Sequence, residues 1–208
     1  MKRAVAVVLS VATIMMIICS VCLAKEFPDV ESSHWAYKYI DELSDQNIIN
    51  GYEDGTYQPG GTVKRSEFLK LTIAACMPKG IDPEELMTPF DHWAAPYVWY
   101  AEERGVIKSG EYTKENIDEP ITRLEMARLI SNADILVKST PSETKTPKTE
   151  FSDIMSLSDE DYDLLCHAVN RGLIKGYEDY TFKPDQTMTR AEAATMIWRF
   201  NGGKEVSE

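Results

Sequence analysis

The stretch MTRAEAATMI, residues 188–197, has the pattern of a helix start and occurs in two further forms along the chain. ITRLEMARLI occupies residues 121–130, and VKRSEFLKLT occupies residues 63–72. Each copy carries an arginine at the same place: Arg65, Arg123 and Arg190. Three copies of one polar helix start within 208 residues indicate an internal repeat.

The spacing of the arginines sets the register of this repeat. Arg65 and Arg123 are 58 residues apart, and the same shift carries the His-Trp pair at 34–35 onto 92–93. A shift of 125 residues, from Arg65 to Arg190, carries the Gly-Tyr pair at 51–52 onto 176–177. We therefore predict three repeats, at residues 25–80, 81–138 and 151–203.

Each repeat contains two helical patterns. Apolar or small residues follow each arginine at the spacing of one helix face. These residues, predicted to be buried, are Phe68, Leu71, Thr72, Ala75, Met126, Leu129, Ile130, Ala133, Ala193, Met196, Ile197 and Phe200. A first helix is expected at about 33–45, with Ala36, Ile40 and Leu43 inward, and Tyr57 and Phe182 should fold back from the loops onto the core. One helix pair cannot bury both apolar faces, so we predict an all-α fold in which three pairs share one core.

The local chemistry of the helix start accounts for two of its three recurring polar residues. Thr189 and Glu192 have the spacing of a capping box, and the copy in repeat 2 has the same spacing. Repeat 1 has Lys64 in place of the threonine and so keeps half of the box. Capping leaves the arginine unexplained, because a cation is disfavoured at the positive end of the helix dipole. It either pairs with a neighbouring carboxylate or forms an anion site with free backbone N–H groups.

The longer pattern resembles the S-layer homology domain. In repeat 1 the matching run is Phe27-x-Asp29-Val30, His34-Trp35-Ala36, Gly51-Tyr52-x-Asp54-Gly55-Thr56-Tyr57-x-Pro59 and Arg65-x-Glu67. Repeat 3 matches at Phe151, Asp153, Ile154, Gly176, Tyr177, Asp179, Thr181, Phe182, Pro184, Thr189, Arg190 and Glu192. The resemblance covers residues 26–201. It implies a three-pronged pseudo-trimer, with the first helices in a central bundle and the arginine segments lining grooves between prongs.

The same resemblance implies a function and a set of site residues. The expected function is non-covalent binding to secondary cell-wall polysaccharide, typically through a pyruvate ketal on N-acetylmannosamine, whose carboxylate the arginines would hold. Trp35 and Trp93 either stack on sugar rings or have a role in packing. The expected ligand-binding residues are Arg65, Arg123, Arg190, Asp29, Asp153, Trp35, Trp93, Gly51, Tyr52, Gly176 and Tyr177. Gly51 and Gly176 could equally serve turn geometry alone.

The repeats depart from the family pattern in different ways. Repeat 2 lacks the Gly-Tyr-x-Asp-Gly loop, and repeat 3 has Glu160 where a tryptophan is expected. We therefore expect three unequal grooves, of which at least one does not bind.

The N-terminal segment is typical of an exported protein. Lys2 and Arg3 precede an apolar run that ends in Cys-Leu-Ala at 22–24, which predicts a signal peptide at 1–24. An uncleaved membrane anchor is the alternative. Residues 139–150, STPSETKTPKTE, are predicted to be a flexible linker. Cys76 and Cys166 are expected to remain separate thiols.

Other classes of function find little support in the sequence. The formal net charge of −12 argues against a nucleic-acid partner. The three histidines lack metal-ligand spacing, and the acidic loops lack the alternating carboxylates of a calcium loop, so we expect no metal, no cofactor and no catalysis. The main alternative is a protein–protein module that docks on other surface proteins without binding glycan.

Overall fold

The computed structural model describes residues 26–78, 81–138 and 151–203. The predicted leader and the predicted linker lie outside these residues. The helical elements are α2 (Tyr37–Asp45), α3 (Arg65–Cys76), η1 (Pro83–Glu85, a 3-10 turn), α4 (Ala95–Glu103), α5 (Arg123–Lys138), α6 (Asp159–Asn170) and α7 (Arg190–Phe200). Over the described ranges the only β pairing consists of three isolated bridges. The all-α prediction is therefore confirmed.

The three arginines begin α3, α5 and α7, and the caps that precede them match the sequence. Thr189 accepts a hydrogen bond from the backbone N–H of Glu192, whose carboxylate accepts one from the N–H of Thr189 at 2.8 Å. Repeat 2 forms the same box. In repeat 1 the Glu67 carboxylate accepts from the N–H of Lys64 at 2.9 Å, but the lysine side chain has no acceptor to complete the box.

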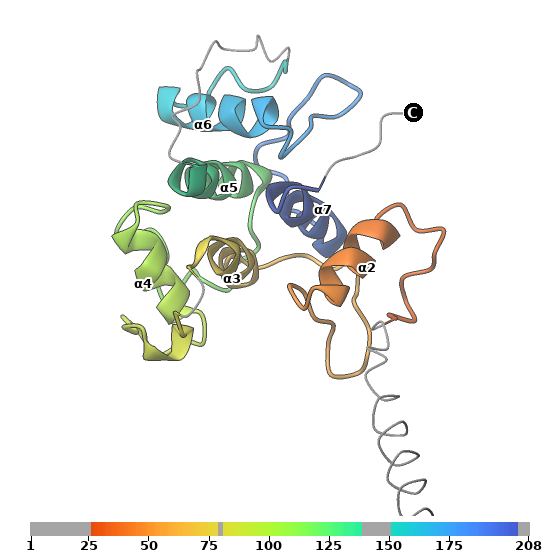
Figure 1. Cartoon of the computed structure of the whole chain (residues 1–208). Coiled ribbons are helices and arrows are strands. Elements are labelled where there is room, and N and C mark those ends of the chain that lie inside the picture. The colour runs from red at the N-terminus through yellow and green to blue at the C-terminus, as the bar shows by residue number, and fades with distance from the viewer. Residues whose placement is uncertain (1–25, 79–80, 139–150, 204–208) are drawn as a thin grey trace, which may run out of the picture.

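The arrangement of the helices differs from the expected central bundle of first helices. The arginine-bearing second helices α3, α5 and α7 lie at the centre, and α2, α4 and α6 lie around them (Figure 1). Each first helix packs against the second helix of the preceding repeat: α4 on α3, α6 on α5, and α2 on α7. In α2, Ile40 and Leu43 are the buried apolar residues.

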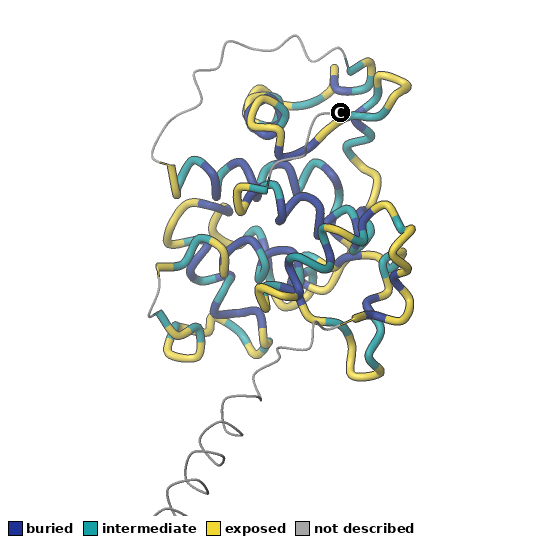
Figure 2. The backbone as a smooth tube through the Cα atoms, turned by 45° about the vertical axis from the view of Figure 1, so that its right-hand side comes forward, coloured by how far each residue is buried: buried dark blue, intermediate teal, exposed yellow. Residues whose placement is uncertain are grey.

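One core runs through all three repeats, as expected. Burial concentrates along the central helices, and the loops form the exposed rim (Figure 2). Tyr57 and Phe182 are buried from their loops, as predicted. The predicted apolar face of α3 is wrong in one place: Ala75 is exposed, whereas Leu69 and Ile73 are buried. The single-face pattern fails there because α3 contacts α4, α5 and α7 on different sides.

A ring of backbone hydrogen bonds joins the segments that precede the three central helices. The N–H of Val63 donates to the carbonyl of Met188, that of Met188 to Ile121, and that of Ile121 to Val63. Their N···O distances are 3.0, 3.3 and 3.0 Å. These residues are equivalent under the shifts of 58 and 125, so the ring gives the arginine segments a three-fold pattern of contacts.

The two cysteines beyond the predicted leader are separate thiols, whereas the membrane-anchor alternative falls on residues outside the described ranges. Cys76 and Cys166 do not form a disulfide with each other. Burial raises the pKa of the Cys76 thiol to about 12, which makes it a poor nucleophile. Among the helices within residues 26–203 that the structure describes, none combines the length and apolar character that crossing a bilayer requires.

Candidate functional site

The backbone N–H groups at the start of each central helix already have partners. The N–H of Arg65 donates to Glu119, that of Arg123 to Gln186, and that of Arg190 to Gly61, at 2.8–3.0 Å. In each case the acceptor carbonyl belongs to the following repeat in cyclic order. The expectation of free N–H groups for an anion is therefore wrong, because the contact between repeats uses them.

Arg190 lies against the loop of repeat 1. Its Nε donates to the carbonyl of Tyr57 at 2.7 Å, and its Nη1 lies 3.3 Å from the Glu67 carboxylate. The guanidinium carbon is 4.7 Å from the ring centroid of Tyr52 and 4.6 Å from that of Tyr57. Its Nη2 donates to the carbonyl of Asn50 at 3.4 Å, and its side chain is 12% exposed.

Arg123 makes the equivalent contacts with the loop of repeat 3 but is buried. Its Nε donates to the carbonyl of Phe182 at 2.7 Å, and its Nη2 donates to that of Lys175 at 2.9 Å. The rings of Tyr177 and Phe182 lie 4.5 and 4.9 Å from the guanidinium carbon. Burial lowers the pKa of Arg123, and the neighbouring Tyr177 and Glu192 partly offset that effect.

Arg65 meets the divergent loop of repeat 2. Its Nε donates to the Glu125 carboxylate at 2.8 Å, and its Nη1 lies 2.5 Å from Glu119. Tyr112 lies beneath the guanidinium at 5.7 Å. Burial alone would lower the pKa of Arg65, but the hydrogen bond and charge of Glu125 outweigh it and the pKa is raised. All three arginines thus use the carboxylate pairing that the sequence left open.

The loop residues of the site support the arginines. Asp29 accepts hydrogen bonds from the N–H groups of Tyr57 and Gln58, at 2.8 and 2.7 Å. Asp153 repeats both contacts in the loop of repeat 3, with the N–H groups at positions 182 and 183. These carboxylates fix the carbonyl to which the arginine donates, which is a structural role.

The two loop glycines are required by close packing. A Cβ at Gly51 would lie 2.5 Å from the ring of Phe27, and one at Gly176 would lie 2.0 Å from Phe151. No side chain larger than hydrogen fits between the loop and that ring.

Two of the arginines open onto grooves that are equivalent under the repeat. Groove 1 has a cavity of about 230 Å³ lined by Ile49, Asn50, Tyr57, Val63, Glu67, Lys70, Leu71, Trp93, Arg190 and Ala193. Groove 2 has a cavity of about 120 Å³ lined by Trp35, Arg123, Leu173, Ile174, Lys175, Met188, Glu192, Thr195, Met196 and Arg199. Each groove combines the arginine of one repeat, the loop and second helix of the next, and the tryptophan of the third.

The sequence left two roles open for Trp35 and Trp93, stacking on sugar rings or packing, and their exposure argues against a role in the core. Trp35 is 58% exposed and Trp93 is 55% exposed, each in the turn before a first helix. Exposure of so large an aromatic surface is unfavourable in water, so these rings do not serve the core. They form an apolar wall of the grooves.

Lys70 is one of the groove residues that the sequence reasoning missed, as are Lys175 and Arg199 in groove 2. It lies half-exposed on α3, one turn after Glu67, and lines groove 1. Each arginine is paired within the protein, whereas Lys70 makes no ion pair with any residue in the described part of the chain. A signal was present, because two of the three repeats carry a cation five residues after the arginine, Lys70 and Arg128.

The grooves are positive although the protein is acidic. The lining of groove 1 carries Arg190 and Lys70 against Glu67, a net charge of +1. The lining of groove 2 carries three cations against Glu192, a net charge of +2. Contact with a groove cation lies well within the screening length, so the global charge of −12 does not exclude an anionic ligand. No group of three metal-ligating side chains occurs among the described residues.

Fold and site define a class: an all-helical repeat protein with exposed aromatic grooves between its repeats. The family model of the S-layer homology domain matches residues 26–69 and 165–194, in repeats 1 and 3. An S-layer protein of Bacillus thuringiensis subsp. finitimus is 29% identical over 205 residues, covering 94% of this chain and 24% of the relative. These matches support an S-layer homology domain protein.

Other relatives are longer proteins of different kinds that match this chain over a part of their length. A cellulosome-anchoring protein of Acetivibrio thermocellus is 29% identical over 113 residues, covering 51% of this chain and 25% of the relative. An amylopullulanase of Thermoanaerobacterium thermosulfurigenes is 29% identical over 179 residues, which is 9% of that enzyme. The chain therefore spans a quarter or less of these relatives. The S-layer relatives indicate the cell-surface location expected from the sequence.

Proposed function

We propose that the chain anchors non-covalently to the cell wall by binding an anionic secondary cell-wall polysaccharide in its inter-repeat grooves. One observation carries this proposal: each of two equivalent grooves joins an exposed tryptophan to a net positive lining in an otherwise acidic protein. The names of the S-layer and cellulosome-anchoring relatives support an anchoring role. We propose no catalytic role.

The ligand chemistry follows from the geometry of groove 1. A sugar ring has apolar C–H faces that stack on an aromatic ring, for which Trp93 is exposed. A carboxylate on that sugar would meet Lys70 and the guanidinium of Arg190, which both line the groove. A pyruvate ketal bridges two oxygens of the sugar and holds its carboxylate on the ketal carbon beside the sugar ring, so pyruvylated N-acetylmannosamine fits both requirements. Tyr52 lies behind Arg190 and orients it.

Wall sacculi stripped of protein provide the test. The wild-type chain should sediment with them, and removal of the pyruvate ketals by mild acid should abolish this. Loss of apolar contact in Trp93→Ala should weaken binding about tenfold. The control Met87→Ala removes an equally exposed apolar side chain outside both grooves and should bind normally.

The protein–protein alternative predicts a different pattern. In that case the chain would sediment only with sacculi that keep their surface proteins, and ketal removal would have no effect. Retention of full binding by ketal-free sacculi would refute the proposed ligand even if the wall remained the partner.

A further inference from the structure

The third groove position, between repeats 2 and 3, differs from the other two in its chemistry. A shift of 125 residues from repeat 1 aligns Trp35 with Glu160, and a shift of 67 residues from repeat 2 aligns Trp93 with Glu160. The same shifts align Asp161 with an alanine in both other repeats. Arg128 is the equivalent of Lys70, and Lys108 is the equivalent of Lys175. This position thus keeps its cations but has replaced the tryptophan by a carboxylate.

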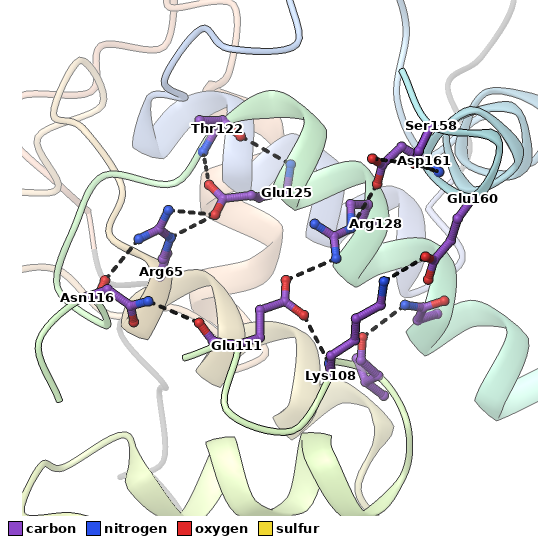
Figure 3. A network of polar contacts seen from close by, with 12 residues as sticks. Arg65, Lys108, Glu111, Asn116, Thr122, Glu125, Arg128, Ser158, Glu160 and Asp161 are labelled. Carbon is purple, nitrogen blue, oxygen red and sulfur yellow. Dashed lines mark hydrogen bonds and ion pairs between the residues drawn. The ribbon is translucent and has the colours of Figure 1, made fainter. Parts of the chain in front are cut away.

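The carboxylates are in contact with those cations. Lys108 Nζ lies 2.6 Å from Glu160, and Arg128 Nε lies 3.2 Å from Asp161, as Figure 3 shows. Arg128 Nη2 also lies 3.1 Å from Glu111. The Arg128 Nε–H is not aligned for a hydrogen bond, so its contact with Asp161 is an ion pair only. Arg65, at the back of the same network, is held by Glu119 and Glu125.

The balance of charge at this position is opposite to that of grooves 1 and 2. Three cations, Arg65, Lys108 and Arg128, face five carboxylates, those of Glu111, Glu119, Glu125, Glu160 and Asp161. An incoming anion would have to displace carboxylates that are tethered to the protein and so have a high effective concentration. It would also find no tryptophan face on which to stack.

We infer that the acidic turn at 158–161 is an intramolecular substitute for the anionic ligand and keeps the third groove closed. The chain therefore binds two glycan units, in grooves 1 and 2, and uses the third position as an ion-pair latch between repeats 2 and 3. This count of two sites rests on the proposed function. The latch itself does not, because it is a contact within the free protein.

Calorimetric titration with a pyruvate-ketal N-acetylmannosaminide tests the count. Wild type should bind two equivalents, and Trp35→Ala and Trp93→Ala should each leave one high-affinity site. The double variant should fold and bind about tenfold more weakly in each groove, with no site of wild-type affinity. A site of wild-type affinity in the double variant would place a working site in the third groove and overturn the inference.

Restoring the family pattern gives the converse test. The variant Glu160→Trp/Asp161→Ala removes both latch carboxylates and recreates the Trp-Ala pair of the other repeats. It should gain a third equivalent. A folded variant that still binds two equivalents would show that these carboxylates are not what closes the groove.

A measurement without ligand separates the latch from the proposed function. Glu160→Ala/Asp161→Ala should lower Tm by several degrees at low ionic strength, and 1 M salt should remove most of that difference. Asp91→Ala, which removes an exposed carboxylate lying 3.8 Å from Lys114, should leave Tm unchanged. If wild type binds no ketal, the proposed function fails, and this Tm comparison still decides the latch. An unchanged Tm in the double variant would refute it.

Discussion

Replacement of Arg123 by alanine should destabilise the protein more than replacement of either other arginine. Its side chain is 5% exposed and makes two short hydrogen bonds to backbone carbonyls. A hydrogen bond to a charged group contributes about 1.5–3 kcal/mol, and the variant leaves the buried carbonyl of Phe182 and the partly buried carbonyl of Lys175 without this donor. The variant also avoids the cost of burying the charged guanidinium, which offsets part of this loss. We therefore expect Arg123→Ala to lower the free energy of unfolding by about 3 kcal/mol.

Arg190 provides the comparison within the same chain. It keeps one short carbonyl bond, at 2.7 Å, and its other two contacts are longer, at 3.3 and 3.4 Å. We expect Arg190→Ala to cost about 1.5 kcal/mol and the exposed control Arg104→Ala less than about 0.5 kcal/mol. For a chain of this size, 3 kcal/mol corresponds to a drop in Tm of roughly 6–12 °C.

Urea unfolding followed by circular dichroism would measure these values. A loss below about 1 kcal/mol for Arg123→Ala, or equal losses for Arg123→Ala and Arg190→Ala, would refute the reasoning from burial.

Three further outcomes follow from single side chains. Lys70→Ala should leave Tm unchanged but weaken glycan binding at groove 1 roughly tenfold in calorimetry, with groove 2 unaffected. Lys114→Ala, which removes the same charge elsewhere, should bind as wild type at both grooves; equal affinities for both variants would contradict the role of Lys70. Burial raises the pKa of Asp134, but hydrogen bonds from Lys138 and His167 outweigh it and the pKa is lowered. Its stabilisation is therefore present above the unfolded pKa of about 4 and is lost as the pH falls through the folded value, so Asp134→Asn should cost about 3 kcal/mol at pH 7 and clearly less at pH 3 in urea unfolding. Asn47 has φ 55° where the other repeats have glycine, so Asn47→Gly should stabilise by about 0.5 kcal/mol, and a lower Tm would contradict this account.

Much of the fold could be read from local patterns. The arginine spacing defined three repeats, and the threonine and glutamate residues defined the helix starts. Of the positions that the apolar spacing predicted to be buried in the second helices, all but Leu71 and Ala75 are buried. These features depend on contacts within one or two turns of the chain, so a sequence pattern carries them directly. The sequence also indicates Trp35 and Trp93 as candidate site residues, but it does not indicate their exposure.

The order of the repeats around the core could not be read in the same way. The shifts of 58 and 125 are identical whether an arginine meets the loop of its own repeat or that of a neighbour. The structure places Arg190 on the loop of repeat 1 and Arg123 on that of repeat 3, and leaves Arg65 with the divergent loop of repeat 2. If each arginine met the loop of its own repeat, Arg123 would meet the divergent loop of repeat 2 and would form the weakest binding site. In the structure Arg65 is the arginine that meets this loop.

The sequence by itself therefore determined what each repeat is: two helices, a capped arginine start and a loop that folds back onto the core. Tertiary structure alone decided what the repeats do together. Backbone contacts between repeats use the N–H groups that the sequence left available, and ion pairs close one groove while two others stay open. The physical reason is that these outcomes depend on which distant residues share a surface, and periodicity within a repeat holds no information on that pairing.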